Sequence, residues 1–127
     1  MKNIVIFGSG RHYKVVIDII EKANQYHIVG LIDQFKEVGT IVLGYKILGN
    51  IQSLDQLDVD LYGGIVAIAD NWIRQRAVLE VLSLYKDFNF ITAIHPTAVI
   101  GKHVSIQKGT VVMPNAVINS NSAIGSH

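Results

Sequence analysis

Cysteine is absent from the 127 residues of the sequence, and this absence removes several kinds of chemistry. Disulfide bonds, thiol nucleophiles and zinc sites built on cysteine are all excluded. A chain without disulfides is compatible with a reducing compartment, and we expect a cytoplasmic protein.

An excess of one sign of charge is also absent. The 11 lysine and arginine residues nearly balance the 10 aspartate and glutamate residues, which leaves a formal net charge of +1. Such a balance provides no basic surface for nucleic acid, so we discount nucleic acid as a partner.

Long hydrophobic runs are missing as well. No run approaches the roughly 18 apolar residues that a membrane-spanning helix needs. The first apolar run, residues 4–7, is broken at Gly8 and is too short for a signal peptide. A soluble protein without membrane insertion is therefore expected. The hydrophobic content of 50% suffices for the core of one domain, with or without a small appendage.

The first part of the chain has the pattern of a Rossmann-like α/β unit. The apolar run at residues 4–7 ends in a glycine turn, and a second apolar run at residues 28–33 ends in Asp33. Between them, apolar residues recur at helical spacing, namely Val15, Val16, Ile19 and Ile20. A strand, a helix and a strand in this order predict a parallel pair joined by a right-handed crossover.

Further elements complete the α/β domain. Residues 39–49 suggest a short extended segment, Leu54 and Leu57 a brief helix, and residues 64–69 a third core strand. Asp70 and Asn71 are expected to cap the next helix. The buried positions predicted for that helix are Ile73, Ala77, Leu79, Val81, Leu82 and Tyr85. Residues 88–92 predict a last strand, which closes a domain of residues 1–93.

A second pattern begins at residue 94, where an aliphatic residue returns every six positions. The residues in this register are Ile94, Ile100, Ile106, Val112, Ile118 and Ile124. Gly101, Gly109 and Gly125 fall where corners would be needed. A period of six is typical of a β-helix whose triangular coil uses three short strands with inward aliphatic side chains. Residues 94–127 are therefore predicted to form hexapeptide repeats.

Four segments in order resemble the NeuD/PglD-type sugar O- and N-acyltransferases. They are residues 8–18, 31–33, 67–74 and 94–101. The resemblance implies a Rossmann-like parallel-sheet domain followed by the first coils of a left-handed β-helix, and a homotrimer. Arg11 stands where the family usually has the second of two paired glycines, Tyr13 where it has a small residue, and Ala69 where it has glycine.

The glycine turn suggests a phosphate site. A glycine turn that leads into a helix points backbone N–H groups and the positive end of the helix dipole outward, which suits a diphosphate. Many strand-to-helix turns, however, need glycine without holding a ligand. Tyr13 occupies the place of the third glycine of the dinucleotide fingerprint, so we do not expect NAD. The resemblance implies a nucleotide sugar, UDP- or CMP-linked, with acetyl-CoA as co-substrate and no metal.

Ten residues are predicted to bind this substrate. They are Gly8, Ser9, Gly10, Arg11, His12, Lys14, Asp33, Asp70, Asn71 and Arg74. Several of them have a simpler alternative. Lys14 could neutralise a phosphate or lie on a solvated helix face, and Asp33 could contact uracil or ribose or be a turn residue. His12 could contact the ligand or brace the loop. For Asp70 we favour the N-cap.

No catalytic residue is assigned. Acetyl transfer needs a general base and donors for the oxyanion. The resemblance implies a base histidine within an acidic-His-Asp segment of the β-helix, between two subunits, and this sequence has no such tripeptide. His103 and His127 stand in other contexts, and His95, before Pro96, is expected to fix the junction.

The repeat segment is short. Five complete hexapeptides make fewer than two triangular coils, whereas solenoids usually need about three repeats or more. We therefore expect a truncated protein that retains nucleotide-sugar binding and lacks acetyltransferase activity alone.

Three functions remain open. The first is acetyl-CoA-dependent N-acetylation of a nucleotide-linked amino sugar in surface-glycan biosynthesis. The second is O-acetylation of sialic acid or a related sugar. The third, of another class, is a catalytically silent module for sugar-nucleotide binding or assembly.

Overall fold

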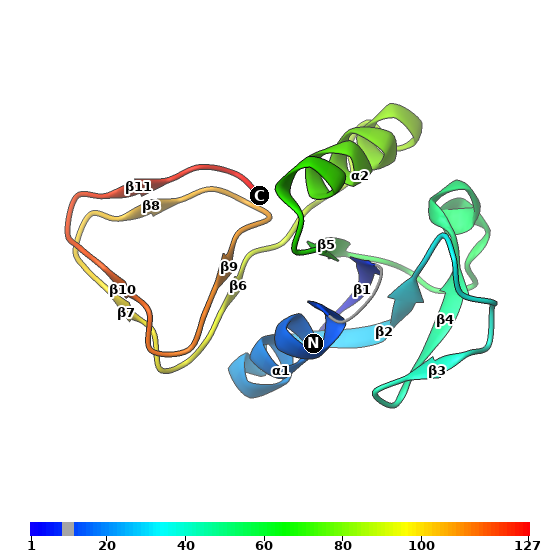
Figure 1. Ribbon diagram of the computed structural model, residues 1–127, viewed down its shortest axis with the longest axis horizontal. Helices are drawn as coiled ribbons and strands as arrows, with labels where there is room; N and C mark the ends of the chain where they lie inside the picture. The colour runs from blue at the N-terminus through cyan, green and yellow to red at the C-terminus, as the bar shows by residue number, and fades with distance from the viewer. Residues whose placement is uncertain (9–11) are drawn as a thin grey trace.

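The computed structural model describes residues 1–8 and 12–127. Figure 1 shows a sheet flanked by helices beside a stack of triangular turns. The first part contains β1 (Lys2–Gly8), α1 (Tyr13–Ala23), β2 (Tyr26–Ile32), β3 (Ile41–Val42), β4 (Tyr45–Gly49), the 3-10 helix η2 (Ile51–Gln56), β5 (Gly63–Ala67) and α2 (Asn71–Leu84). The second part contains β6 (Ala93–Ile94), β7 (Val99–Ile100), β8 (Ser105–Ile106), β9 (Val111–Val112), β10 (Val117–Ile118) and β11 (Ala123–Ile124). No helix in the described residues is long and apolar enough to cross a membrane.

The sheet of the first part has the strand order β3-β4-β2-β1-β5. Strand β1 lies between β2 and β5 and pairs in parallel with both. Strand β4 adds in parallel to β2, and β3 pairs with β4 in the antiparallel direction. The predicted parallel pair and third core strand are confirmed. The segment predicted as extended at residues 39–49 forms β3 and β4, and the brief helix is η2.

The two faces of the sheet carry separate hydrophobic clusters. Because successive strand residues point to opposite faces, Ile4 and Ile6 of β1 pack with α1, whereas Val5 and Phe7 pack with η2 and α2. All four side chains are buried. Helix α1 therefore covers one face of the sheet, and α2 covers the other.

The prediction for the buried face of α2 was wrong at three positions. Ile73, Leu79 and Leu82 are 50%, 66% and 36% exposed, whereas Val81 is fully buried. Val78 and Val81 form the stripe that contacts the sheet. Leu79 and Leu82 each follow one position later, about 100° around the helix, and point away from it. A narrow contact stripe explains why Leu79 and Leu82 remain at the surface.

The last predicted strand of the first domain, residues 88–92, is also largely absent. It is reduced to one bridge between Phe90 and Gly64. The rings of Phe88 and Phe90 instead pack against each other, with centroids 5.1 Å apart, and Phe88 lies 5.4 Å from Phe7. The chain then leaves the sheet because β6 pairs with β9 of the second part.

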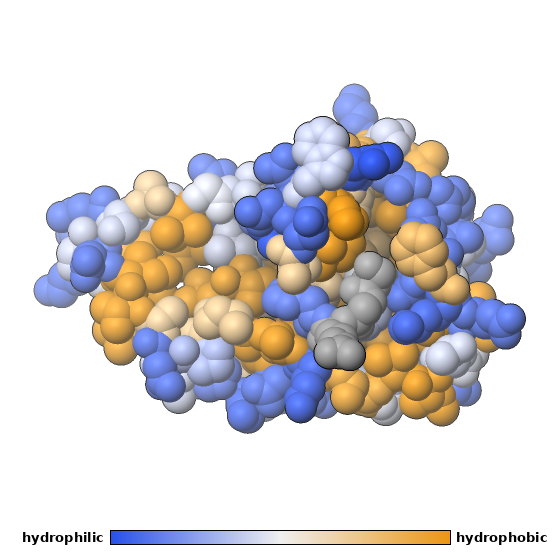
Figure 2. Space-filling view, in the orientation of Figure 1, coloured by the Kyte–Doolittle hydropathy of each residue, from blue (hydrophilic) through white to orange (hydrophobic). Residues whose placement is uncertain are grey.

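The second part is a triangular coil of hexapeptides, as predicted. Three parallel pairs, β6 with β9, β7 with β10 and β8 with β11, each join residues 18 positions apart, which is three hexapeptides. The aliphatic register stacks in the same way, with Ile94 beside Val112, Ile100 beside Ile118 and Ile106 beside Ile124. Figure 2 shows hydrophobic side chains gathered within this triangle and hydrophilic ones around its corners.

The corners of the coil use asparagine and histidine as well as glycine. A positive φ recurs every six residues, at His103, Gly109, Asn115, Asn121 and His127. Of the three glycines predicted at corners, Gly109 alone has this conformation. The physical reason is that asparagine and histidine tolerate the left-handed region better than most residues do.

The two remaining predicted corner glycines differ from each other. A Cβ on Gly101 would collide with the backbone of Ser120, so Gly101 permits the close approach of two successive turns. A Cβ on Gly125 would meet open space. Neither of them has the positive φ that a left-handed corner requires.

His95, which was expected to fix the junction, makes its side-chain hydrogen bonds within the coil. Its side chain is buried, and its Nδ1 accepts a hydrogen bond from the Thr97 backbone N–H at 3.0 Å. The Thr97 hydroxyl in turn accepts from the Asn115 backbone N–H at 2.9 Å, one turn further along the coil. His95 therefore helps to hold two successive turns of the coil together.

The contrast within α2 gives a test of this packing. Val81→Ala should lower the free energy of unfolding by about 1–3 kcal/mol, because it removes a fully buried side chain from the sheet contact. Leu79→Ala, two positions away on the exposed side, should change it by less than about 0.5 kcal/mol. Urea denaturation of both variants measures the difference, and equal effects would contradict the packing described.

Candidate functional site

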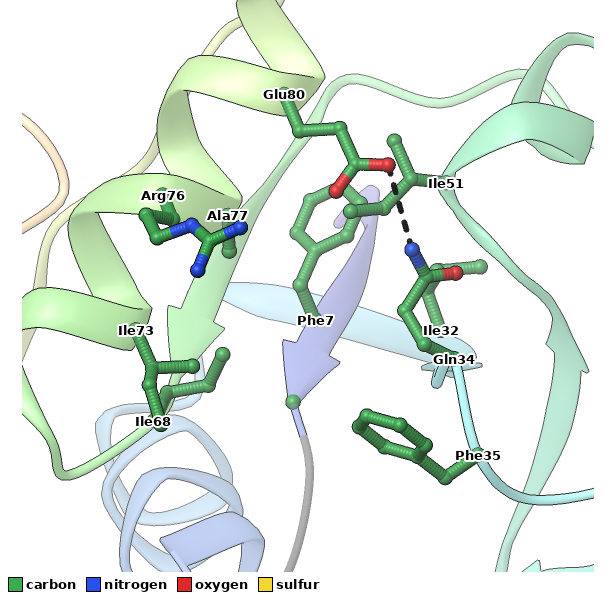
Figure 3. Close-up of a pocket in the computed structure, with 11 residues that line it drawn as sticks. Phe7, Ile32, Gln34, Phe35, Ile51, Ile68, Ile73, Arg76, Ala77 and Glu80 are labelled. Atoms are coloured by element: carbon green, nitrogen blue, oxygen red, sulfur yellow. Dashed lines mark hydrogen bonds between the residues drawn. The ribbon is translucent and has the colours of Figure 1, made fainter.

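A cavity of about 760 Å³ opens at the carboxyl ends of β1, β2 and β5. Strand order reverses at β1, because the chain runs from β1 to β2 on one side and returns to β5 on the other. Ligands of open parallel sheets bind at such a crevice. The residues around the cavity are Phe7, Gly8, Ile32, Gln34, Phe35, Ile51, Ile68, Ile73, Arg76, Ala77 and Glu80 (Figure 3).

The cavity combines an apolar base with a few polar groups on its walls. Phe7, Ile32 and Ile51 form part of the base. Glu80 and Gln34 face each other across the cavity, and the Gln34 Nε2 donates to Glu80 Oε1 at 3.3 Å (Figure 3). An apolar cleft with few convergent polar groups is the usual form of a small-molecule site.

Among the described residues, Gly8 is the one predicted substrate-binding residue that lines this cavity. A Cβ on Gly8 would lie 2.8 Å from the Tyr13 ring and 2.9 Å from the Ala67 carbonyl oxygen. Glycine is therefore needed here for the close packing of α1 on the strand ends. Ser9, Gly10 and Arg11, also predicted to bind substrate, lie outside the described residues.

Asp33 is buried and holds the loop that follows β2. Its Oδ1 accepts hydrogen bonds from the backbone N–H groups of Phe35 at 2.8 Å and Lys36 at 3.2 Å. Its Oδ2 lies 3.0 Å from the Tyr13 hydroxyl, which donates to it. These bonds are those of a turn residue, which was the simpler of the two roles considered. By holding the turn, Asp33 positions Gln34 and Phe35 at the cavity.

Tyr13 joins α1 to the same network. Its hydroxyl also lies 3.0 Å from the carbonyl oxygens of Gly8 and Ile32. Burial, and then the negative charge of Asp33 and the hydrogen bond to it, raise the pKa of the Tyr13 hydroxyl far above its ordinary value. Tyr13 therefore stays protonated and available as a donor.

Asp70 caps α2, as favoured from the sequence. It has an extended backbone, and its Oδ1 accepts from the Ile73 backbone N–H at 3.0 Å. Such a cap contributes about 1 kcal/mol to helix stability.

Asn71 and Arg74 come together beside the cavity, next to Ile68 of its lining. The Arg74 guanidinium donates to the Ile68 carbonyl oxygen at 3.2 Å and to Asn71 Oδ1. His12 is partly buried, and burial, followed by the positive charge of Arg74, lowers the pKa of its imidazole below the ordinary value. Asn71 and Arg74, both predicted to bind substrate, thus lie one helical turn apart and in contact, and the imidazole of His12 is held towards its neutral form.

Lys14 lies elsewhere. It lines a second cavity of about 670 Å³ between α1 and the turn after β9, together with Asp18, Glu21 and Met113. The structure does not bring Lys14 to the cavity that Gly8 lines. The exposed side chain is consistent with the solvated helix face that was its alternative role.

Sequence reasoning missed the polar residues of the cavity wall, Gln34, Arg76 and Glu80. Gln34 directly follows Asp33, and its position just after the end of β2 was a signal that it could lie at the ligand crevice. Arg76 and Glu80 are four positions apart and share a face of α2 with Ile73. That spacing indicates that the two side chains lie together on the helix. It does not indicate which face of α2 turns to the cavity, or which strand ends face that helix. Among the described residues, no group of three histidine, aspartate or glutamate side chains could hold a metal ion.

Tyr13→Phe tests the buried network around Asp33. Loss of the hydroxyl leaves the buried Asp33 Oδ2 without its donor, so the free energy of unfolding should fall by about 1–3 kcal/mol. Tyr45→Phe is the control, because its hydroxyl donates to Glu21 at the exposed surface, and its effect should stay below about 0.5 kcal/mol. Urea denaturation measures both, and a neutral Tyr13→Phe would refute the network.

Arg74→Ala tests the electrostatic coupling to His12. Removal of the guanidinium charge should raise the His12 pKa towards its ordinary value, and the His127 pKa should rise with it. Arg76→Ala removes the same charge on the same helix and should leave both pKa values unchanged. NMR titration of the imidazole C2–H signals measures the shifts, and an unchanged His12 pKa in Arg74→Ala would contradict the proximity.

Comparison with characterised proteins relates this geometry to a family. Residues 3–82 match the family described as the PglD N-terminal domain. The chain is 33% identical over 118 residues to the UDP-N-acetylbacillosamine N-acetyltransferase of Bacillus subtilis (strain 168), which covers 89% of this chain and 52% of that protein. It is 32% identical over 126 residues to the GDP-perosamine N-acetyltransferase of Escherichia coli O157:H7, covering 94% of this chain and 55% of that one. The chain thus spans about half the length of these relatives.

Solved structures of other proteins have a similar fold over almost the whole of this chain. A mutant of perosamine N-acetyltransferase from Caulobacter crescentus, in complex with CoA and GDP-perosamine, has 30% identity and a TM-score of 0.84 over 99% of this chain and 58% of its own. The acetyltransferase domain of PglB from Neisseria gonorrhoeae FA1090, in complex with acetyl coenzyme A, has 25% identity and a TM-score of 0.81 over 98% of this chain and 59% of its own. With the family match over residues 3–82, these likenesses show that the chain belongs to the PglD N-terminal domain family, and its relatives from Bacillus subtilis, Escherichia coli and Caulobacter crescentus are sugar N-acetyltransferases.

Proposed function

We propose that this chain is the nucleotide-sugar-binding part of an acetyl-CoA-dependent N-acetyltransferase that acts on a nucleotide-linked amino sugar in surface-glycan biosynthesis. The observation that carries the proposal is the cavity at the carboxyl ends of β1, β2 and β5, in a chain of this family. N-acetylation is preferred to O-acetylation because both curated relatives are named as N-acetyltransferases of nucleotide-linked sugars.

The charges around the cavity support a ligand that carries a diphosphate. Arg76 is the basic residue among the described residues that line it, and Gly8 lies where β1 leads towards α1. A glycine turn at a helix N-terminus favours phosphate oxygens, and an arginine can pair with them bidentately. We place the diphosphate between Arg76 and Gly8, and Ser9, Gly10 and Arg11 stay predicted ligands of it. Lys14 has no part in this arrangement.

The sugar would then extend towards His12, Asn71 and Arg74. Arg74 donates to the carbonyl oxygen of Ile68, which lines the cavity just after β5, and Asn71 pairs with Arg74. An imidazole held towards its neutral form can accept or donate a hydrogen bond without adding charge. We therefore propose that these three residues bind the polar groups of the sugar. Asp70 would contribute indirectly, by capping the helix that carries Asn71 and Arg74.

Acetyl transfer requires groups beyond this binding site. For the whole protein we propose acetyl-CoA as co-substrate and a homotrimer as the assembly. No histidine of residues 94–127 stands in the acidic-His-Asp segment expected of the catalytic base. We propose that this chain alone binds the nucleotide sugar and does not transfer the acetyl group.

Ile73→Glu tests the assigned cavity by placing a negative charge on its wall. Isothermal titration of the unmodified chain with UDP-, GDP- and CMP-linked amino sugars should show saturable binding of at least one of them. Ile73→Glu should weaken that binding by about tenfold or more, because the new carboxylate repels the diphosphate.

Leu79→Glu is the matched control, since it adds the same charge to an exposed position of the same helix, outside the cavity lining. It should leave the affinity unchanged. Failure of a folded chain to bind any nucleotide sugar would overturn the proposed function. Equal weakening by both variants would show that binding occurs elsewhere.

A further inference from the structure

The nucleobase is the part of the substrate on which the relatives differ. One is named for a UDP-linked sugar, and others for GDP-linked sugars. We infer that the cavity of this chain recognises guanine, and that Glu80 is the residue that selects it. This inference rests on the proposed function, because it names the nucleotide that the same cavity binds.

Glu80 is held at the cavity by two amides from different parts of the chain. Its Oε1 accepts from Gln52 Nε2 at 2.6 Å and from Gln34 Nε2 at 3.3 Å. Gln52 belongs to η2 and Gln34 to the turn that Asp33 fixes. The carboxylate is therefore oriented before any ligand arrives, and Figure 3 shows it turned from α2 towards the space above Phe7.

A carboxylate at this position matches the hydrogen-bonding edge of guanine. Guanine presents two adjacent donors, N1–H and the 2-amino group, which can donate in parallel to the two oxygens of one carboxylate. Uracil presents one donor between two carbonyl oxygens. Adenine and cytosine each present an amino group next to a ring nitrogen lone pair. With any of these three bases, one carboxylate oxygen would face an acceptor, which is repulsive.

The two amides differ in how easily a base would replace them. The Gln52 hydrogen bond is short, at 2.6 Å, whereas that of the exposed Gln34 is 3.3 Å. Entry of the base would displace Gln34 and leave Gln52 to hold the carboxylate. Glu80 would lose the hydrogen bond from the Gln34 amide and accept two from guanine, from N1–H and the 2-amino group. It would therefore gain one hydrogen bond when guanine binds.

An aromatic side chain is available to cover the base. Phe35 is 85% exposed although it lines the cavity, and Figure 3 shows its ring at the mouth, across from Ile73. A purine between this ring and the apolar side chains of α2 would bury surface that is otherwise open to water. Phe35 supplies contact area for any base, so the selection among bases falls to Glu80.

The first test compares nucleoside diphosphates on the unmodified chain. In isothermal titration, GDP should bind about tenfold or more tightly than UDP, ADP and IDP. IDP is the sharpest comparison, because hypoxanthine keeps N1–H and lacks only the 2-amino group of guanine. This test needs no variant, so it does not depend on how a substitution affects folding.

The second test changes Glu80 itself. Glu80→Gln replaces one carboxylate oxygen by an amide donor, which suits xanthine because its C2 carbonyl oxygen stands in place of the amino group. The variant should lose about tenfold or more in GDP affinity and gain affinity for XDP. Glu21→Gln, an exposed glutamate on α1 outside this cavity, is the matched control and should change neither.

The outcomes separate this inference from the proposed function. Tight binding of UDP in preference to GDP, or equal binding of GDP and IDP, would overturn guanine recognition and leave nucleotide binding intact. The absence of binding by every nucleoside diphosphate and nucleotide sugar to a folded chain would overturn both.

Discussion

The buried carboxylate of Asp33 is the constraint on which the candidate site depends. It accepts from the backbone of the loop after β2 and from the hydroxyl of Tyr13 at the start of α1. A buried charge is tolerated only when donors compensate for the water it loses, so these elements must keep their relative positions. Because the Tyr13 ring also packs on Gly8, the ends of β1 and β2 and the start of α1 form one unit.

The cavity is assembled on this unit from segments distant in sequence. Strand β1 supplies Phe7 and Gly8, the loop held by Asp33 supplies Gln34 and Phe35, and α2 supplies the opposite wall. The position of β1 between β2 and β5 opens the crevice in which open α/β sheets hold ligands. The exposed Ile73 is explained by the same geometry, since it faces this opening.

The second part follows a different physical rule from the first. Each hexapeptide forms one side of a triangle, and stacking at an offset of 18 residues pairs its backbone with that of the next turn. The left-handed residues recur with the same period of six. The coil therefore depends on neighbouring repeats, whereas the sheet depends on contacts between strands and helices.

The sequence by itself determined the features that depend on local chemistry. Gly8 at the end of β1, the cap at Asp70 and the six-residue period predicted the α/β unit and the coil, because local spacing dictates helices, strands and repeats. Only the tertiary structure decided which side chains meet. Gln34 and Glu80 are 46 positions apart, Lys14 turned to another cavity, and Leu79 faced solvent. Such contacts follow from how helices rotate and dock on a sheet, which depends on the packing of the whole core rather than on any local pattern.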